Sequence, residues 1–302
     1  MKLNFQFPAR AVKHWESWVG EHHLAELAVA AEENGFDMVS STDHPFPESG
    51  WLEGGGHHAF DPFVSLAFMA AATQRIRVMT FILVSAYRHP YVSAKAAASL
   101  DLLSGGRLTV GMGAGYQKAE FDVLGAEFAD RGPRFDAAMK AMQAAWTGEV
   151  LDYDDPYFPA HGHVMLPRPA QRPGPPIWIG GNGKVALRRV AQYADGWCPF
   201  EQPEAMAKVT STPALAFEQL KQKVEELKRM RVEFGRTAEV DVCYSPHMGR
   251  DPEGNVEVLN AGFASYAEAG ATWVSIESNA RSFDDCIREI ELYGKALERP
   301  AA

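Results

Sequence analysis

Strand-like and helix-like segments alternate along almost the whole chain, and this alternation limits the possible folds more than any other feature. Repeated βα units favour parallel strands joined by right-handed crossovers, and about eight such units favour a closed barrel. We expect strands at residues 3–7, 36–41, 76–84, 108–112, 177–179, 196–199, 239–244 and 272–277. We expect helices at residues 24–35, 60–73, 91–104, 134–146, 185–194, 214–234, 256–269 and 283–297.

The fold class that follows is α/β, a (β/α)8 TIM barrel formed by a single domain over residues 1–302. The length of 302 residues suits it, since such barrels take roughly 250 residues or more. Residues 147–176 are rich in Pro, Gly, Asp and Tyr, so we expect an irregular insertion there. Barrels of this kind carry their chemistry at the C-terminal ends of the strands, which indicates where a site should lie.

Composition favours a protein that acts on a small molecule. Charged residues make up 23% of the chain, and the net charge of −10 is spread without any block of Lys and Arg. This diffuse acidity argues against nucleic acid or an anionic membrane as a partner. The N-terminal residues MKLNFQF show no charged-then-apolar leader, and no apolar stretch is long enough to span a membrane. Because the three cysteines are widely spaced and form no disulfide framework, we expect a cytoplasmic protein.

The second expected strand ends in Asp43 and His44, side by side where barrel enzymes place catalytic groups. Histidine can move a proton near neutral pH, and aspartate can fix its tautomer or bind a ring nitrogen or hydroxyl. A loop-capping aspartate beside a packed histidine is an equally good interpretation of the sequence alone.

The fourth expected strand runs into alternating glycines, Gly111, Gly113 and Gly115, with Ala114 between them and Tyr116 after them. Glycines at a strand end leave one face without side chains, which permits contact with a flat ring. The alternative is close backbone packing inside the barrel. The spacing is not that of the dinucleotide-binding fingerprint.

The fifth expected strand ends in Gly180, Gly181, Asn182 and Gly183 and leads directly into a helix. Such a turn exposes backbone N–H groups at the positive end of the helix dipole, which is an anion site and most often a phosphate site. We favour phosphate binding over a tight turn without a ligand, because three glycines in four residues exceed what a turn requires. The segment lacks the ending of a nucleotide triphosphate loop.

Other residues are weaker candidates. His57 and His58 follow three glycines in an expected loop over the barrel mouth, and Trp51 and Trp197 could line a pocket there, although burial is usual for Trp. His161 and His163 resemble the paired histidines of barrel zinc hydrolases, but they lie in the insertion and are better interpreted as surface residues.

Three long segments together carry a resemblance to a known family. They are RHPYVSAKAAASLDLLSGGRLTVGMGAGY at residues 88–116, FDVLGAEFADRGPRFD at residues 121–136, and RPAQRPGPPIWIGGNGKVALRRVAQYADGW at residues 168–197. The chain resembles the luciferase-like monooxygenase superfamily, and within it the branch of F420-dependent oxidoreductases. The resemblance implies a bacterial luciferase-like barrel with an insertion, a homodimer, and either coenzyme F420, a deazaflavin, or FMN as cofactor.

The resemblance also implies roles for single residues. His44 would be the acid or base beside the ring, and Asp43 would contact the ring or its hydroxyl. A bulge with a cis non-prolyl peptide bond would back the ring at Thr80 and Phe81. Ala114 and Tyr116 match positions near the cofactor, and Gly180, Gly181, Asn182 and Gly183 match its phosphate site.

Tyr116 stands where some F420-dependent relatives carry a glutamate. This chain therefore departs from the sugar-phosphate dehydrogenases of the family, and the identity of a second acid or base is open.

The leading expectation is a hydride transfer between F420 and a small organic substrate. An FMN-dependent monooxygenase is the first alternative, and a barrel zinc hydrolase is a distant one. A protein that binds the cofactor without turnover is also consistent with the sequence.

Overall fold

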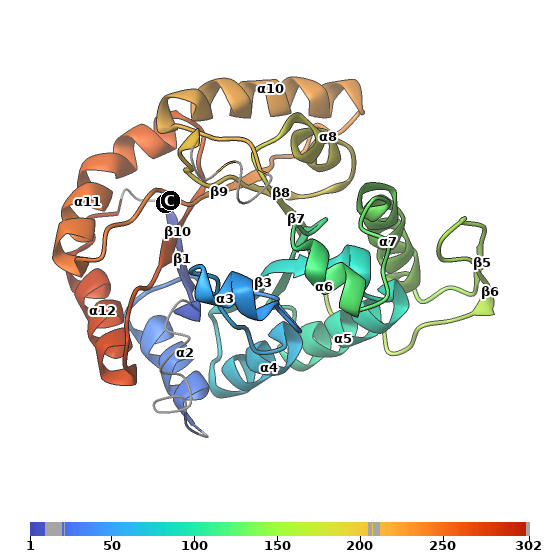
Figure 1. The fold of residues 1–302 in the computed structure, drawn as a ribbon, viewed down its shortest axis with the longest axis horizontal. Helices are drawn as coiled ribbons and strands as arrows, with labels where there is room; N and C mark the ends of the chain where they lie inside the picture. The colour runs from blue at the N-terminus through green and yellow to red at the C-terminus, as the bar shows by residue number, and fades with distance from the viewer. Residues whose placement is uncertain (10–19, 21, 205–206, 208–211, 300–302) are drawn as a thin grey trace.

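The structure is a computed structural model that describes residues 1–9, 20, 22–204, 207 and 212–299. Eight parallel strands form a closed barrel in the order β1-β10-β9-β8-β7-β4-β3-β2, as the alternation predicts (Figure 1). The ring closes because β1 pairs with both β10 and β2. The barrel strands are β1 (Lys2–Gln6), β2 (Met38–Ser41), β3 (Arg77–Val84), β4 (Leu108–Gly113), β7 (Ile177–Gly180), β8 (Gly196–Cys198), β9 (Asp241–Tyr244) and β10 (Trp273–Glu277).

Helices surround the barrel on the outside (Figure 1). Several begin at strong local signals: Asp61, Asp251 and Ser282 each cap a helix by accepting a hydrogen bond from a backbone N–H group of its first turn. The main helices are α2 (His23–Glu33), α4 (Pro62–Ala72), α5 (Pro90–Leu103), α7 (Arg131–Trp146), α8 (Lys184–Tyr193), α10 (Leu220–Glu233), α11 (Pro252–Glu268) and α12 (Phe283–Ala296). None of the described helices is long and apolar enough to cross a membrane.

Three apolar clusters occur among the described residues, and two of them form the core of the barrel. The larger one lies between the strands and the helices. The smaller one contains Met38, Met79, Trp178, Cys198, Cys243 and Trp273. All six residues lie within barrel strands and alternate with residues of the larger cluster, so their side chains point inward. The barrel interior is therefore packed, and a ligand has to bind at its end.

Strand β3 contains a bulge whose position corrects our expectation. Thr80 pairs with Val110 and Leu83 pairs with Met112, so Phe81 and Ile82 together face a single residue of β4. The cis peptide bond joins Phe81 to Ile82, and not Thr80 to Phe81 as expected. The reason is that Thr80 still belongs to the regular ladder, and its hydroxyl donates to the carbonyl of Gly111 at 2.8 Å.

Four further segments differ from expectation. The insertion contains an antiparallel hairpin, β5 (Leu151–Tyr153) and β6 (Ala160–His163), which stands beyond α7 and away from the barrel (Figure 1). Two short helices, α3 (Ser49–Glu53) and α6 (Lys118–Val123), lie in loops after β2 and β4. The helix expected to begin at residue 214 begins at Leu220, because Leu215 is held extended by two backbone hydrogen bonds with Gln202.

Candidate functional site

A pocket of about 840 Å³ opens at the C-terminal ends of the barrel strands. Most of the barrel strands contribute to its wall, through Gln6, Ser40, Phe81, Gly113, Gly180, Cys198 and Glu277. Asp43, His44 and the glycine-rich segment after β7 also line it. The structure thus brings the Asp43–His44 pair and the glycine-rich segment, which lie far apart in the sequence, to one pocket.

His44 has a partner that the sequence did not reveal. Its Nδ1 atom lies 2.8 Å from Oε2 of Glu120, and both side chains are almost fully buried. A carboxylate on Nδ1 favours the tautomer with the proton on that nitrogen, which leaves Nε2 as the acceptor. No hydrogen bond to Nε2 occurs within the part of the chain that the structure describes. Because His44 lines the pocket, Nε2 is the atom it can offer to a ligand.

Asp43 is tied to strand β3 and to the segment that follows it. Its carboxylate accepts hydrogen bonds from Nη2 and Nε of Arg88, at 2.6 and 3.1 Å, and from the backbone N–H of Val84 at 3.0 Å. Burial raises the pKa of Asp43, and the hydrogen bonds from Arg88 and Val84 act against this rise. Asp43 lines the pocket, but it is not the residue that orients His44.

Aromatic rings surround His44. The ring centroids of Trp51, His57 and Tyr116 lie 4.7, 4.8 and 6.0 Å from that of His44. His57 and Tyr116 line the pocket, whereas His58 is exposed and contributes its carbonyl to Nδ1 of His57. The expected aromatic surroundings therefore come from three residues on loops after β2 and β4.

Ile82 forms the floor of the pocket, and glycines on both sides make room for it. A Cβ atom added to Gly113 would lie 3.0 Å from Cγ2 of Ile82, and one added to Gly180 would lie 3.0 Å from its Cγ1. At Gly111 an added Cβ would lie 2.2 Å from the carbonyl oxygen of Thr80. The alternating glycines therefore serve close packing within the barrel, which is the second of our two interpretations. By leaving room for Ile82, they also let its side chain form the surface of the pocket.

The segment after β7 forms a cradle of backbone N–H groups at the pocket. The N–H groups in the first turn of any helix have no partner within that helix. No side chain caps those of α8, so they can bind a ligand. Gly183, Lys184, Val185 and Ala186 all line the pocket at this end. Gly181 has φ +118°, a conformation that other residues adopt only with strain. The arrangement fits a phosphate group, which the backbone and the helix dipole would hold.

Two residues that we expected to touch a ligand hold this cradle by hydrogen bonds, and of the two only Asn182 lines the pocket. The side-chain NH₂ of Asn182 donates to the carbonyls of Phe200 and Pro213, and its oxygen accepts from the N–H of Phe200. Trp197 is fully buried in the outer core, where its Nε1 donates to the carbonyl of Gly181 at 2.8 Å. Trp197 points outward because its neighbour in β8, Cys198, points into the barrel, so the expectation that Trp197 lines the pocket is wrong.

Sequence reasoning missed Glu120, Arg88 and Ile82. Glu120 and Arg88 are charged residues in stretches that otherwise predict packing, and only tertiary structure brings them to His44 and Asp43. The available signal for Glu120 was its place on the loop after the fourth strand, four residues beyond Tyr116. Ile82 was hidden because a bulge cannot be located from an apolar strand pattern.

No cluster of three or more His, Cys, Asp or Glu side chains suited to a metal ion occurs in the described segments. His161 is exposed and pairs with Asp152 at 2.8 Å, in agreement with its interpretation as a surface residue. The site therefore gives the zinc hydrolase alternative no support.

An eight-stranded parallel barrel, with a buried histidine and a glycine-rich helix start at the same mouth, defines a TIM-barrel protein with a pocket at the C-terminal ends of its strands. The comparison with protein families agrees with this class. The chain matches the family model of the luciferase-like monooxygenases over residues 13–282, and it belongs to that family.

The chain matches curated relatives that share one description. An F420-dependent glucose-6-phosphate dehydrogenase of Gordonia bronchialis is 32% identical over 232 residues, which cover 74% of this chain and 64% of that protein. Further dehydrogenases with the same description are matched over about half of their length, so the chain spans only half to two thirds of these curated relatives.

Solved structures confirm the fold. A monooxygenase from Streptomyces bottropensis superimposes with a TM-score of 0.77 at 22% identity, with 98% of each chain covered. The coenzyme F420 dependent tetrahydromethanopterin reductase of Methanopyrus kandleri gives a TM-score of 0.69 at 16% identity, also with 98% of each chain covered.

Proposed function

We propose that this protein is an oxidoreductase that transfers a hydride between coenzyme F420 and a small organic substrate. The observation that carries the proposal is the His44–Glu120 pair in a pocket that also holds a phosphate cradle. Relatives described as F420-dependent dehydrogenases support the choice of coenzyme. The pocket volume of about 840 Å³ accommodates a coenzyme together with a small substrate.

The residues present fit such a coenzyme. The N–H groups at the start of α8 would hold its phosphate, and Ile82 with the neighbouring glycines would support its ring. The bound deazaflavin supplies a carbon that donates or accepts the hydride. Asp43 is the proposed contact to the ring edge, held in place by Arg88.

His44 supplies the proton chemistry in this proposal. Glu120 holds the proton on Nδ1, so Nε2 can accept a proton from a substrate hydroxyl and return it in the reverse reaction. The buried carboxylate also stabilises the imidazolium that forms. Trp51, His57 and Tyr116 keep bulk water away from this exchange.

Titration of the purified protein with F420 and with FMN, followed by fluorescence, tests the proposal. We expect F420 to bind at least tenfold more tightly than FMN. Preferential binding of FMN would overturn the F420 assignment.

An FMN-dependent monooxygenase is the second candidate, because a monooxygenase superimposes well on the fold. Oxygen uptake separates the two functions, since a reduced flavin reacts with oxygen and a reduced deazaflavin essentially does not. Uptake with reduced FMN alone would favour the second candidate.

We also propose that the protein works as a homodimer in the cytoplasm. Val64 and Phe68 of α4, and Val92 and Leu103 of α5, are each more than half exposed. Two neighbouring helices with exposed apolar side chains offer a surface for a second copy of the chain. The three free and buried cysteines suit a reducing compartment.

A further inference from the structure

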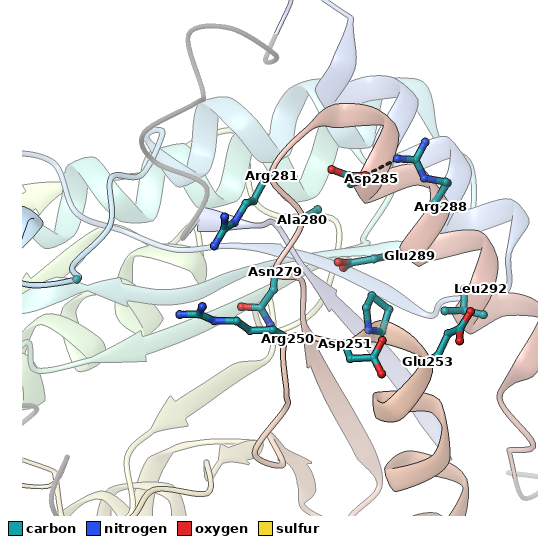
Figure 2. Close-up of a pocket in the computed structure, with 12 residues that line it drawn as sticks. Arg250, Asp251, Glu253, Asn279, Ala280, Arg281, Asp285, Arg288, Glu289 and Leu292 are labelled. Carbon is teal, nitrogen blue, oxygen red and sulfur yellow. Dashed lines mark hydrogen bonds and ion pairs between the residues drawn. The ribbon is translucent and has the colours of Figure 1, made fainter.

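A second pocket, of about 790 Å³, lies beside the first at the same end of the barrel. Its wall is formed by the loop from β9 to α11, the loop from β10 to α12 and the first turns of α12 (Figure 2). Arg250 and Arg281 extend their guanidinium groups into it from these two loops, with Asn279 between them (Figure 2).

Most acidic groups in this second pocket already have partners. Asp251 accepts a hydrogen bond from the N–H of Gly254 at the start of α11. Asp285 is bound by Ser282 and Arg288 on its own helix, and these bonds lower its pKa.

Glu289 is buried and accepts a hydrogen bond from the hydroxyl of Ser278 at 2.6 Å. Burial raises its pKa, although the bond from Ser278 acts against this. Glu253 is exposed to solvent.

Arg250 and Arg281 differ from most of these acidic residues because their side chains are unpaired among the described residues. Neither guanidinium has an ion pair or a hydrogen bond within the residues that the structure describes. A guanidinium is always charged and presents a planar fork of donors that matches a carboxylate or a phosphate. Two such groups, directed into one cavity and paired with none of its acidic side chains, can bind an anion there.

The position agrees with a general property of barrels. The loops after the seventh and eighth strands frequently form a phosphate site, and β9 and β10 are the seventh and eighth barrel strands of this chain. Asn279 in this pocket follows Glu277 of the first pocket by two residues, and Gly55 precedes His57 by two. Two residues of extended chain span about 6.6 Å, so the linings of the two pockets adjoin along both of these loops.

We propose that the substrate carries a carboxylate or phosphate group and that Arg250 and Arg281 bind it. This inference rests on the proposed function, since it describes the substrate of the same site. The reacting carbon of such a substrate lies near His44, and its anionic end lies in the second pocket. Binding weakens as salt screens the charges.

Titration with inorganic phosphate tests the anion site without any coenzyme. In 20 mM salt we expect two classes of site, one at α8 and one at the arginines. In the double variant Arg250→Gln/Arg281→Gln, the phosphate affinity of the second class of site falls about tenfold for each arginine removed. Arg229→Gln, an equal change of charge on the exposed side of α10, is the matched control and leaves both classes intact. An unchanged affinity in the double variant, or an equal loss in the control, would overturn the proposal.

Competition for the bound phosphate identifies the anion. Displacement by succinate at a lower concentration than by glycerol 2-phosphate indicates a carboxylate substrate, and the reverse order indicates a phosphate monoester. Displacement by neither, up to the concentration at which sodium chloride displaces phosphate, shows only general charge attraction and contradicts the proposal.

Turnover links the site to the substrate. Reduced F420 is offered to neutral carbonyl compounds and to matched compounds that carry a carboxylate or a phosphate. We expect the anionic member of each pair to have the higher kcat/KM, and the double variant to remove this preference while the neutral member is unaffected. A preference that survives in the double variant contradicts the role of the arginines. If no compound of either kind oxidises reduced F420, the proposed function fails, while the phosphate titration still decides whether the anion site exists.

Discussion

Nδ1 of His44 and Oε2 of Glu120 lie 2.8 Å apart although 76 positions separate these residues in the chain. His44 follows β2 and Glu120 lies on α6, the short helix after β4. The bond joins the two sides of the pocket across strand β3. It holds the His44 ring by Nδ1 and leaves Nε2 available at the pocket.

Replacement of His44 by alanine tests the proton transfer. We expect kcat to fall about 10²–10⁴-fold, because that is the usual contribution of general acid–base catalysis. Coenzyme affinity, measured by fluorescence titration, should change less than threefold. Equal losses in kcat and affinity would show that His44 only binds the ligand.

Replacement of Glu120 by glutamine separates positioning from catalysis. The amide can still meet Nδ1 but no longer stabilises a positive imidazole, so we expect kcat to fall about tenfold, roughly 1.4 kcal/mol of the barrier, with KM little changed. The lower limb of the pH–rate profile should move to lower pH, because an imidazolium without its carboxylate partner loses its proton more easily. Asp122→Asn, an exposed change on the same helix, is the control. A pH profile identical to that of the unmodified protein would rule out this role.

Gly183→Asp tests the phosphate cradle. Gly183 has ordinary extended φ and ψ values at the N-cap of α8, and aspartate is a preferred N-cap residue. We expect the melting temperature to stay the same or rise, while F420 affinity falls at least tenfold because a carboxylate now occupies the anion site. Gly183→Asn provides a neutral cap and should weaken binding less.

Gly181→Val is a less specific test, since its φ of +118° makes any side chain strained. We expect weaker coenzyme binding there too, accompanied by a lower melting temperature. If Gly183→Asp binds F420 as tightly as the unmodified protein does, the cradle does not bind the phosphate of the coenzyme.

Gly180→Ala tests the floor of the pocket. The new methyl group would lie 3.0 Å from Ile82, and such overpacking costs about 1–3 kcal/mol. The free energy of unfolding, measured with denaturant, should fall by this amount. When Ile82 is alanine the same substitution should cost less, because its neighbour is gone. Strict additivity of the two changes would contradict the contact.

Phe68→Glu tests the proposed dimer. Phe68 is 53% exposed on α4, and a charge there opposes burial in an interface. Light scattering should show a monomer for this variant and a dimer for the unmodified protein. Val232→Glu on α10 removes another exposed apolar side chain and should leave the dimer unchanged. If the unmodified protein and the Phe68→Glu variant are both monomers, the proposed homodimer is refuted.

The sequence predicts most of the fold because each barrel unit repeats a local pattern. Asp43, His44 and the glycines before α8 could be found since they stand next to each other at strand ends. Glu120 and Arg88 could not, because their importance comes from contacts made across the barrel mouth. Trp197 was assigned wrongly because the strand that contains it is too short to show which side chains point inward. The hairpin of the insertion was missed because its strands have only three and four residues.

The Ile82 floor has a stereochemical consequence. The barrel is packed below Ile82, so the pocket is closed on that side. A planar ring that rests on this side chain always presents its other face to an incoming molecule. Deuterium exchanged at such a ring should consequently be found on one prochiral face, whereas a pocket open from both sides would scramble the label.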